Sequence, residues 1–509
     1  MKQKFDFKNR YTLIIFWSIM LVAIILRVGK FVTYSGGLNQ DEASIGYDAY
    51  SLLKYGIDRN GISLPVHLIA WGSGQNAMYA YLSMPFIAIF GLTAFSVRIV
   101  NFLAAIGTVA AIYFLCKDLF GKRVALIAMT LTAIAPWHIM LSTWGLESNL
   151  LPAMFIFALL LLVKSFKKPW LICISAAVFS LCLYTYGSAY VAVPIFMLLA
   201  VITILKNKLI PLKWVVPAFG IFVVMSIPIA LFVLINKFGW NSISLGPITI
   251  PAMTGKARIN VMTDSFSFTK TIIDFWNNII YQHDGTLLNA IPVYGCFYVI
   301  SVPFTICGII EAFKRKNIGI KLLIYSLISS ITIFFVLIDI NINRVNIIFL
   351  PLIIITALGI SSAIKTKQVA LAVLCTYAIF TVGFTSVFYG PNYTNQLNNL
   401  NFISFDTAIK YADKISGDET VNVTQTVNMP YIYVLFYTEE NPNEYLKTVK
   451  IDNYDVQFQQ VNSFGKWNFN INGYFYNEPG IYIIDNEYVN LDSPHSIVQF
   501  EKYSVVTID

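Results

Sequence analysis

The sequence predicts a mainly α-helical membrane protein, in which a polytopic bundle of about eleven transmembrane helices precedes a small C-terminal extracytoplasmic α+β domain. Two observations predict this fold class. Of the 509 residues, 57% are hydrophobic and only 12% are charged, and the mean hydropathy of +0.66 is too high for a soluble chain. Apolar runs of about 17 to 22 residues also recur between short basic breaks, and a helix of that length crosses a hydrocarbon layer about 30 Å thick.

The apolar runs define the predicted spans. They cover residues 11–32, 95–115, 124–142, 149–164, 169–183, 186–205, 214–236, 293–312, 322–339, 345–363 and 368–388. The first run follows several basic residues, as in a signal peptide, but it has no small-residue cleavage site and is long enough to span. We therefore expect it to be retained as the first helix.

The Lys and Arg residues predict the orientation, because cytoplasmic loops are enriched in them. With a cytoplasmic N-terminus, every short basic loop falls on the cytoplasmic side. These loops hold Lys117, Lys122, Arg123, Lys164, Lys167, Lys168, Lys206, Lys208, Lys213, Lys314, Arg315, Lys316, Lys321, Lys365 and Lys367. The net charge of +8 is thus explained by topology, and we expect a multi-pass protein of the plasma membrane that contacts membrane lipid and no nucleic acid.

The polar C-terminal region predicts a second domain outside the cytoplasm. Asp406 to Lys414 has an amphipathic helical pattern, and short β-rich runs follow. These runs lie at residues 421–427, 451–461, 480–484 and 496–508. We therefore predict a transmembrane domain at 1–388, which includes outward loops 33–94 and 237–292, and an extracytoplasmic α+β domain at 389–509.

The six cysteines and four histidines predict neither a disulfide framework nor a metal site. The cysteines lie within or beside apolar segments, and the histidines are scattered without ligand spacing. We expect no metal and no other cofactor.

Two adjacent acids, Asp41 and Glu42, come soon after the first span, on the predicted outer side. Ala43 to Lys54 have a helix-compatible pattern, with Ile45, Ala49, Leu52 and Leu53 as its apolar stripe. One explanation is that the acids only stabilise the N-terminus of this helix, where the helix dipole is positive, and have no further function. Alternatively, they present two carboxylates to water at the membrane surface.

A third acid, Glu147, lies at the start of the predicted fourth span, on the same outer side. Ionisable residues at the edge of lipid are costly and usually line a cavity. The three acids therefore suit a general-base site, in which one carboxylate deprotonates an acceptor hydroxyl and the others orient it. A phosphate leaving group would need a cation, and Arg98 and Arg344 are candidates, although a terminal arginine also commonly snorkels to the interface.

The long outward loop contributes a further polar segment, which contains His283, Asp284 and Asn289. His283 beside Asp284 suits a proton relay. Ordinary polarity of an exposed loop is the alternative explanation.

The chain resembles the glycosyltransferases of the C superfamily, specifically the bacterial relatives of protein O-mannosyltransferases and aminoarabinose transferases, which are family 39-like. Three segments carry the resemblance: residues 41–53 (DEASIGYDAYSLL), 90–98 (FGLTAFSVR), and the pair 135–138 (APWH) and 144–147 (WGLE). It covers about the first 200 residues well. Beyond them it depends on residues 284–294, on Arg344 and on the general plan.

The resemblance implies transfer of a sugar from a polyprenyl-phosphate carrier to an acceptor outside the cytoplasm, with inversion at the anomeric carbon and with Asp41 as the base. The acceptor would be a glycan, a lipid or a protein. We accordingly predict two groups of site residues. The catalytic group is Asp41, Glu42 and Glu147, and the substrate-binding group is Arg98, Arg344, Tyr47, His283, Asp284 and Asn289.

Thr143 departs from the family pattern, because similar sequences commonly have Arg at that position. A cation expected near Glu147 is therefore missing, and Arg98 or Arg344 would have to compensate. Two other functions remain open: a transporter or lipid flippase, and a non-catalytic envelope-assembly protein of the same fold. The acids gather at one surface, and we find no clear internal repeat, which favours the transferase.

Overall fold

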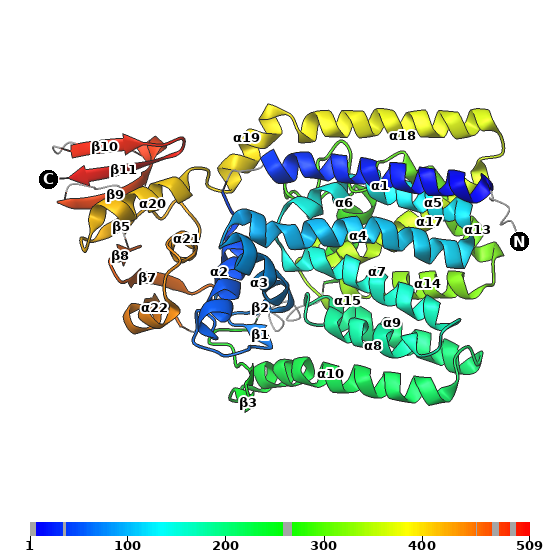
Figure 1. Cartoon of the computed structure of the whole chain (residues 1–509), viewed down its shortest axis with the longest axis horizontal. Coiled ribbons are helices and arrows are strands. Elements are labelled where there is room, and N and C mark those ends of the chain that lie inside the picture. The colour runs from blue at the N-terminus through cyan, green and yellow to red at the C-terminus, as the bar shows by residue number, and fades with distance from the viewer. Residues whose placement is uncertain are drawn as a thin grey trace, which may run out of the picture. The chain divides into compact units, whose positions relative to one another are not determined.

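The computed structural model describes residues 7–33, 37–257, 267–454, 456–470, 478–488 and 495–508 (Figure 1). Its contacts divide the chain into two compact units. The first, which we call the helical unit, comprises residues 1–33, 101–227 and 262–390, and the second, the mixed unit, comprises 34–100, 228–261 and 391–509. Each unit is therefore assembled from segments that are distant in the sequence.

Long apolar helices dominate the chain, and the described residues include eight that are long and apolar enough to cross a membrane. These are α1 (Phe7–Thr33), α4 (Ala94–Phe120), α7 (Glu147–Ser165), α9 (Ala189–Lys206), α10 (Leu212–Phe238), α14 with α15 (Ile318–Ile331, Ile333–Val336), α16 with η3 and α17 (Ile342–Val345, Asn346–Ile348, Phe349–Ala363), and α18 (Lys367–Phe388). A bent pair of helices brings the number to nine. The chain is a multi-pass membrane protein, as predicted.

Two of the eleven predicted spans are shorter helices. Residues 169–183 form only α8 (Leu171–Cys182), and residues 293–312 form only α13 (Ser301–Lys314). Upstream of α13 the backbone enters the left-handed region at Gly295 and Tyr298, with φ of 65° and 62°, and this interrupts the helix. A hydropathy profile detects apolar character but not such a backbone turn.

The bent pair joins α5 (Lys122–Ile134) to α6 (Pro136–Met140) and η1 (Leu141–Thr143), with a bend of 60°. Pro136 makes the preceding Ala135 extended, which ends α5. The buried Arg27 of α1 donates to the carbonyls of Thr132 and Ala133 at this end, at 3.2 and 2.9 Å, and lies 2.8 Å from Nδ1 of His138. Arg27 therefore fixes the turn that leads toward Glu147.

Packing within the helical unit is closest where α13 meets α17. A Cβ atom on Gly308 would collide with the carbonyl of Ile355, and one on Gly359 would collide with the carbonyl of Phe304. Small residues commonly allow such close approach between helices in membranes. By contrast, α1, α10 and α18 bury at most 22% of their apolar windows inside the protein, so most of their surface faces lipid.

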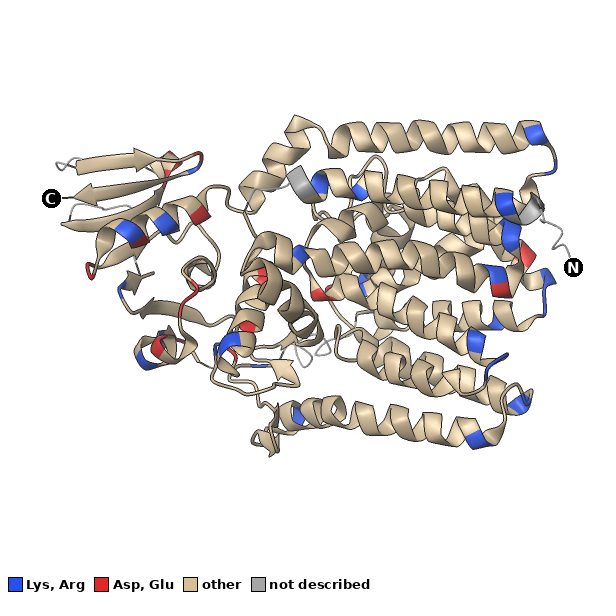
Figure 2. Cartoon of the chain, viewed as in Figure 1, with Lys and Arg blue, Asp and Glu red and all other residues tan. Residues whose placement is uncertain are grey.

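Figure 2 shows Lys and Arg gathered at one end of the bundle in the helical unit. The loops that carry them join α4 to α5, α7 to α8, α9 to α10, α13 to α14, and α17 to α18. This is the distribution that the positive-inside bias predicts for cytoplasmic loops.

In the mixed unit, α2 (Gln40–Tyr55) packs against α3 (Met78–Phe90) and α21 (Pro430–Tyr437). Two small hairpins accompany them, β1 with β2 (His67–Leu68, Gln75–Asn76) and β3 with β4 (Ile243–Leu245, Ile248–Ile250). The predicted helix after Asp41 is therefore confirmed. Ile45, Ala49 and Leu52 of its predicted apolar stripe are buried, whereas the prediction was wrong for Leu53, which is exposed.

The C-terminal region contains a seven-stranded sheet of order β10-β11-β9-β5-β8-β7-β6. The strands are β5 (Val421–Val423), β6 (Lys450–Asp452), β7 (Gln460–Phe464), β8 (Trp467–Asn468), β9 (Gly480–Asp485), β10 (His495–Gln499) and β11 (Tyr503–Ile508). β5 runs parallel to β8 and β9, and the other pairs are antiparallel. Helix α20 (Phe405–Ser416) packs on β5, β9 and β11, so the predicted α+β character is confirmed.

Three helices of this region had no predicted counterpart: α19 (Pro391–Leu400), α21 and α22 (Pro442–Thr448). The segment PYIYVLFY of α21 is rich in residues that favour strands, yet it is helical, with Pro430 in its first turn. Packing against α2 accounts for this outcome, because tertiary contacts override local propensity.

Candidate active site

Helix α2 begins with a capping box that involves Glu42. The side chain of Asn39 accepts a hydrogen bond from the backbone of Asp41 at 2.8 Å, and Oε2 of Glu42 accepts from the backbone of Asn39 at 3.0 Å. The expectation that an acid serves the helix N-terminus is therefore correct for Glu42. Glu42 therefore has a structural role, because it caps the N-terminus of α2.

Arg98 completes the surroundings of Glu42. Its Nε lies 2.7 Å from Oε1 and its Nη2 lies 2.8 Å from Oε2, so the guanidinium holds both carboxylate oxygens. Both side chains are buried, with 2% and 0% exposure, and Nη2 of Arg98 also donates to the carbonyl of Gly37 at 2.9 Å. A bidentate pair fixes orientation as well as distance, so the pair holds the first turn of α2 against the start of α4.

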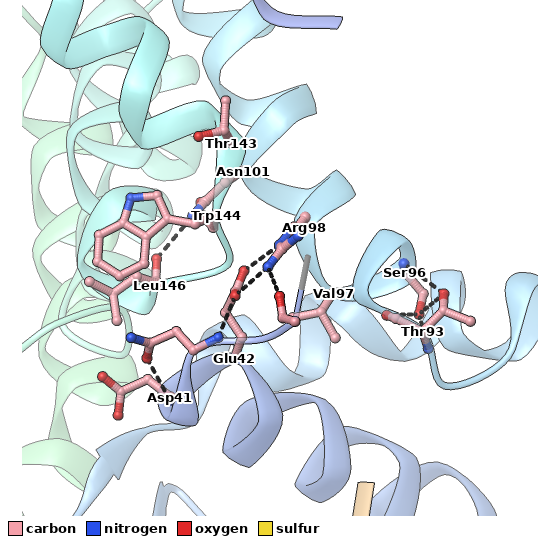
Figure 3. A network of polar contacts seen from close by, with 12 residues as sticks. Asp41, Glu42, Thr93, Ser96, Val97, Arg98, Asn101, Thr143, Trp144 and Leu146 are labelled. Atoms are coloured by element: carbon pink, nitrogen blue, oxygen red, sulfur yellow. Dashed lines mark hydrogen bonds and ion pairs between the residues drawn. The ribbon is translucent and has the colours of Figure 1, made fainter. Parts of the chain in front are cut away.

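Asp41 differs from its neighbour, because it is half-buried. Figure 3 shows its carboxylate pointing away from the Glu42–Arg98 pair. The position at the first turn of α2 places it at the positive end of the helix dipole. Of the two adjacent acids, Asp41 is thus the one whose carboxylate lies outside the pair with Arg98.

The remainder of α2 is held by close packing. A Cβ atom at Gly46 would lie 2.6 Å from the ring of Phe436 and 2.7 Å from Val97, so the helix can approach these neighbours only because residue 46 is glycine. The hydroxyl of Tyr47 donates to the carbonyl of Glu440 at 2.8 Å, and burial raises the pKa of this phenol. This packing role accounts for Tyr47, whose predicted contact with substrate stays a prediction.

A second acid–arginine pair lies farther along α2, where the sequence analysis found no site. Asp48 and Arg59 are both buried, with 3.2 Å between Oδ2 and Nη2. Burial raises the pKa of the Asp48 carboxyl, and Arg59 opposes that shift. Burial and the charge of Asp48 raise the pKa of Asp58 to about 7. The sequence signal, an Asp-Arg dipeptide in a polar loop, is too common to have been singled out.

Glu147 begins α7 in the helical unit and is buried, with 3% exposure. Asn101 holds the turn before it, because its Nδ2 donates to the carbonyls of Trp144 at 2.8 Å and Leu146 at 3.0 Å (Figure 3). Thr143, where relatives commonly have Arg, donates instead to the carbonyl of Met140 at 2.7 Å.

His283, Asp284 and Asn289 lie together in the helical unit. Oδ2 of Asp284 accepts from Nδ2 of Asn289 at 2.7 Å and from the backbone of Ile342 at 2.9 Å, while its Oδ1 accepts from the backbone of Thr286 at 2.9 Å. Asp284 therefore ties its loop to the start of α16. Nδ1 of His283 accepts a 3.3 Å hydrogen bond from the backbone of Gly285.

Arg344 lies in α16 and donates to backbone carbonyls of the segment before that helix. Its Nη1 contacts the carbonyl of Ile338 and lies 2.7 Å from that of Asp339. Asp339 is paired with Lys270, and the ammonium group of Lys270 lowers the pKa of the Asp339 carboxyl. The contact between Arg344 and a phosphate stays a prediction.

The predicted site residues thus divide between the two units. The mixed unit contains Asp41, Glu42, Tyr47 and Arg98, and the helical unit contains Glu147, His283, Asp284, Asn289 and Arg344. The structure brings Glu42 to Arg98, and Asp284 to Asn289. Within the described ranges, no three His, Cys, Asp or Glu side chains are grouped to hold a metal ion.

Comparison with known proteins gives a family and several structures. Residues 75–243, which include Arg98 and Glu147, match the family described as dolichyl-phosphate-mannose-protein mannosyltransferase. No curated protein matches the sequence. The structure of ArnT from Cupriavidus metallidurans in the apo state is 11% identical, with a TM-score of 0.56 over 98% of both chains.

Two further structures are similar. ArnT bound to undecaprenyl phosphate is 11% identical, with a TM-score of 0.54 over 98% of this chain and 97% of that chain. The Archaeoglobus fulgidus oligosaccharyltransferase, tethered with an acceptor peptide, is 13% identical, with a TM-score of 0.51 over 85% of this chain and 64% of that chain. The fold is thus shared over nearly the whole length of ArnT.

Proposed function

We propose that this protein is a membrane glycosyltransferase that moves a sugar from a polyprenyl-phosphate-linked donor to a hydroxyl on an extracytoplasmic acceptor, with inversion at the anomeric carbon. The match of residues 75–243 to a mannosyltransferase family and the fold shared with ArnT support a glycosyltransferase. The undecaprenyl phosphate bound to ArnT supports a lipid-phosphate donor, and the peptide tethered to the archaeal oligosaccharyltransferase supports a separate acceptor. The acceptor would be a glycan, a lipid or a protein.

The observation that carries the proposal is the contrast between the two acids at the start of α2. Arg98 and the backbone of Asn39 engage Glu42, whereas the half-buried Asp41 carboxylate points away from this pair. We assign Asp41 as the general base and Glu42 with Arg98 as the support that orients it. This refines the prediction that both acids are catalytic.

The reaction then follows from ordinary displacement chemistry. Asp41 takes the proton of the acceptor hydroxyl, and the acceptor oxygen forms a bond to the anomeric carbon. The bond from that carbon to the phosphate oxygen breaks, and the lipid phosphate leaves with the electron pair. A single displacement from the opposite face inverts the configuration. The negative charge of the leaving phosphate needs a nearby cation, and we propose that Arg344 provides it.

The proposal includes a topology. The N-terminus is cytoplasmic and the basic loops face the cytoplasm, so residues 33–94, 237–292 and 389–509 are extracytoplasmic. The region 1–388 acts as the transmembrane transferase domain, and the α+β region 389–509 acts as its extracytoplasmic domain. The gathering of Lys and Arg at one end of the helical bundle in Figure 2 supports this orientation.

The test is transfer by the purified Asp41→Asn variant with a polyprenyl-phosphate sugar and a cell-envelope acceptor extract. We expect transfer to fall by about 10³-fold or more, because the base is lost, while the Tm stays within a few degrees of wild type. Asp406→Asn is a matched control, since Asp406 is also a half-buried aspartate in the first turn of a helix of the mixed unit.

Two results would reject the assignment. Transfer by Asp41→Asn at the rate of wild type would exclude Asp41 as the base. Movement of the carrier lipid across vesicles by wild type, without any sugar transfer, would instead identify a flippase.

A further inference from the structure

An open hollow of about 480 Å³ lies within the helical unit, beside the end of α12 (Phe268–Phe275). Asp274, Asn277, Tyr281, His283 and Asp284 are among its lining residues. Of these five residues, only His283 and Asp284 are among the site residues predicted from the sequence. Asp274, Asn277 and Tyr281 come from the end of α12 and the residues directly after it. They form one wall of the hollow, which no sequence motif had indicated.

A π-helical turn, η2 (Trp276–Ile280), builds this wall. The backbone of Tyr281 donates to the carbonyl of Trp276 at 2.9 Å, and the backbone of His283 donates to the carbonyl of Asn277 at 3.0 Å. Single π-helical turns are rare and occur frequently at functional sites. The wide turn places Asn277 and Tyr281 along the same hollow.

Gln282 then holds the backbone in an unusual conformation, with a φ of 57°. Its buried side chain stabilises this geometry, because Oε1 accepts hydrogen bonds from the backbone of Cys296 at 2.9 Å and of Phe297 at 3.0 Å. A left-handed non-glycine residue persists only where its surroundings impose it, and such residues cluster at binding sites. The wall is therefore pre-formed.

Further lining residues of the hollow are also held by hydrogen bonds. Asp284 is held by three donors, as described above, and the carboxamide of the buried Asn278 donates to the carbonyls of Asp274 at 2.8 Å and Ile340 at 3.3 Å. A ligand would thus meet a rigid polar surface, which lowers the entropic cost of binding.

The chemistry of the lining residues indicates the class of ligand. Carboxylates accept hydrogen bonds, and carboxamide and imidazole groups both accept and donate them, so together they suit several neighbouring hydroxyls. Tyr281 is 63% exposed and offers an aromatic face. No Lys or Arg is among the described residues that line the hollow, and two carboxylates are, which disfavours a phosphate.

We propose that this hollow binds a neutral sugar ring, with Tyr281 against one face of the ring and Asn277 and Asp274 hydrogen-bonded to its hydroxyls. This inference depends on the proposed transferase function and assigns a place to one of its carbohydrate groups. The same chemistry suits the sugar of the donor or a sugar of the acceptor, and the experiment separates these sources.

The first arm measures steady-state transfer by Asn277→Ala and Tyr281→Ala, with donor and acceptor varied in turn. Each variant should raise the KM of one substrate by about tenfold and leave kcat within about twofold, because binding is lost and the base is retained. Asn241→Ala and Tyr454→Ala, which alter exposed residues outside the hollow, are the matched controls and should leave both KM values unchanged.

A raised KM for the donor assigns the hollow to the donor sugar, and a raised KM for the acceptor assigns it to the acceptor. Unchanged KM values for both substrates, in variants that transfer at wild-type rates, would overturn the inference while the transferase assignment stands.

The second arm measures direct binding and does not require transfer. Saturation-transfer NMR with methyl glycosides of neutral hexoses should show contacts in wild type that the Asn277→Ala, Tyr281→Ala double variant loses. Equal signals in both proteins, or none in wild type, would overturn the inference. If wild type transfers no sugar, the proposed function fails and this arm alone decides the hollow.

Discussion

Helix α2 carries two buried acid–arginine pairs that differ in how completely their polar atoms are satisfied. In the Glu42–Arg98 pair, the guanidinium meets both carboxylate oxygens and also the carbonyl of Gly37. In the Asp48–Arg59 pair, Nε and Nη1 of Arg59 have no hydrogen-bond partner among the described residues. Buried charge is stabilised only where geometry and hydrogen bonding are good, so the first pair suits a fixed support.

The second pair is also affected by Asp58, whose carboxyl has a pKa of about 7 through burial and the nearby charge of Asp48. Arg59 is held partly by other contacts, since Nη2 donates to Ser44 and the guanidinium lies 4.9 Å from the centre of the Trp71 ring. The comparison teaches that the second pair, which lies beside Asp58, should respond to pH changes near neutrality.

The largest effect is expected from Arg98→Met, which leaves the buried Glu42 charge without its partner. The free energy of unfolding should fall by about 3–5 kcal/mol, and transfer should fall by about 100-fold, because the first turn of α2 is no longer held. Thermal unfolding in detergent and single-turnover transfer measure the two effects.

Two further variants sharpen this prediction. The Glu42→Gln, Arg98→Met double variant should regain much of the stability, since no unpaired buried charge remains. Arg315→Met breaks a partly exposed pair with Glu311 on α13 and should cost at most about 1 kcal/mol. If Arg98→Met is no less stable than Arg315→Met, the Glu42–Arg98 pair is not the support that we describe.

A smaller and pH-dependent effect is expected from Arg59→Met. Without the guanidinium, Asp48 loses the charge that opposes its raised pKa, so the pKa rises further. The carboxyl escapes this penalty at low pH by taking up a proton. The loss of stability should therefore be larger at pH 8 than at pH 5, and equal losses at both would show that Asp48 is not ionised beside Arg59.

An effect of the opposite sign, which also depends on pH, is expected from Asp58→Asn. The pKa of Asp58 is about 7 in the folded state and about 4 when unfolded, so the folded state binds more protons between these values. Wild type thus loses stability as pH rises from about 4 to about 7. The variant lacks this loss, and its Tm should match wild type near pH 4 and exceed it at pH 8. A difference that is constant across this range would contradict the assignment.

Much of the fold could be predicted, because membrane solvation imposes a strong local pattern. Every predicted span corresponds to one helix or to two or three consecutive helices, and the helix after Asp41 begins as expected. What could not be predicted depends on backbone geometry or distant contacts. The left-handed Tyr298, the π-helical turn at 276–280 and the helical state of residues 430–437 are of this kind. Their sequences carry no local signal that distinguishes them from ordinary helix or strand.

The residue types of the candidate site could be predicted from the sequence, but the different roles of these residues could not. Adjacent acids near the end of a span could be identified, and Arg98 could be suspected as a cation. That Arg98 pairs with Glu42, 56 residues away, depends on tertiary packing. The association of residues 391–509 with 34–100 in one unit is likewise absent from any local pattern.

The central claim is that Asp41 takes the proton while Glu42 only holds the helix. Single-turnover transfer and thermal unfolding of Asp41→Asn and Glu42→Gln, compared side by side, test it most directly. We predict that Asp41→Asn loses transfer at an unchanged Tm, and that Glu42→Gln loses Tm and transfer together. Full transfer by Asp41→Asn, with an inactive but fully stable Glu42→Gln, would contradict the account.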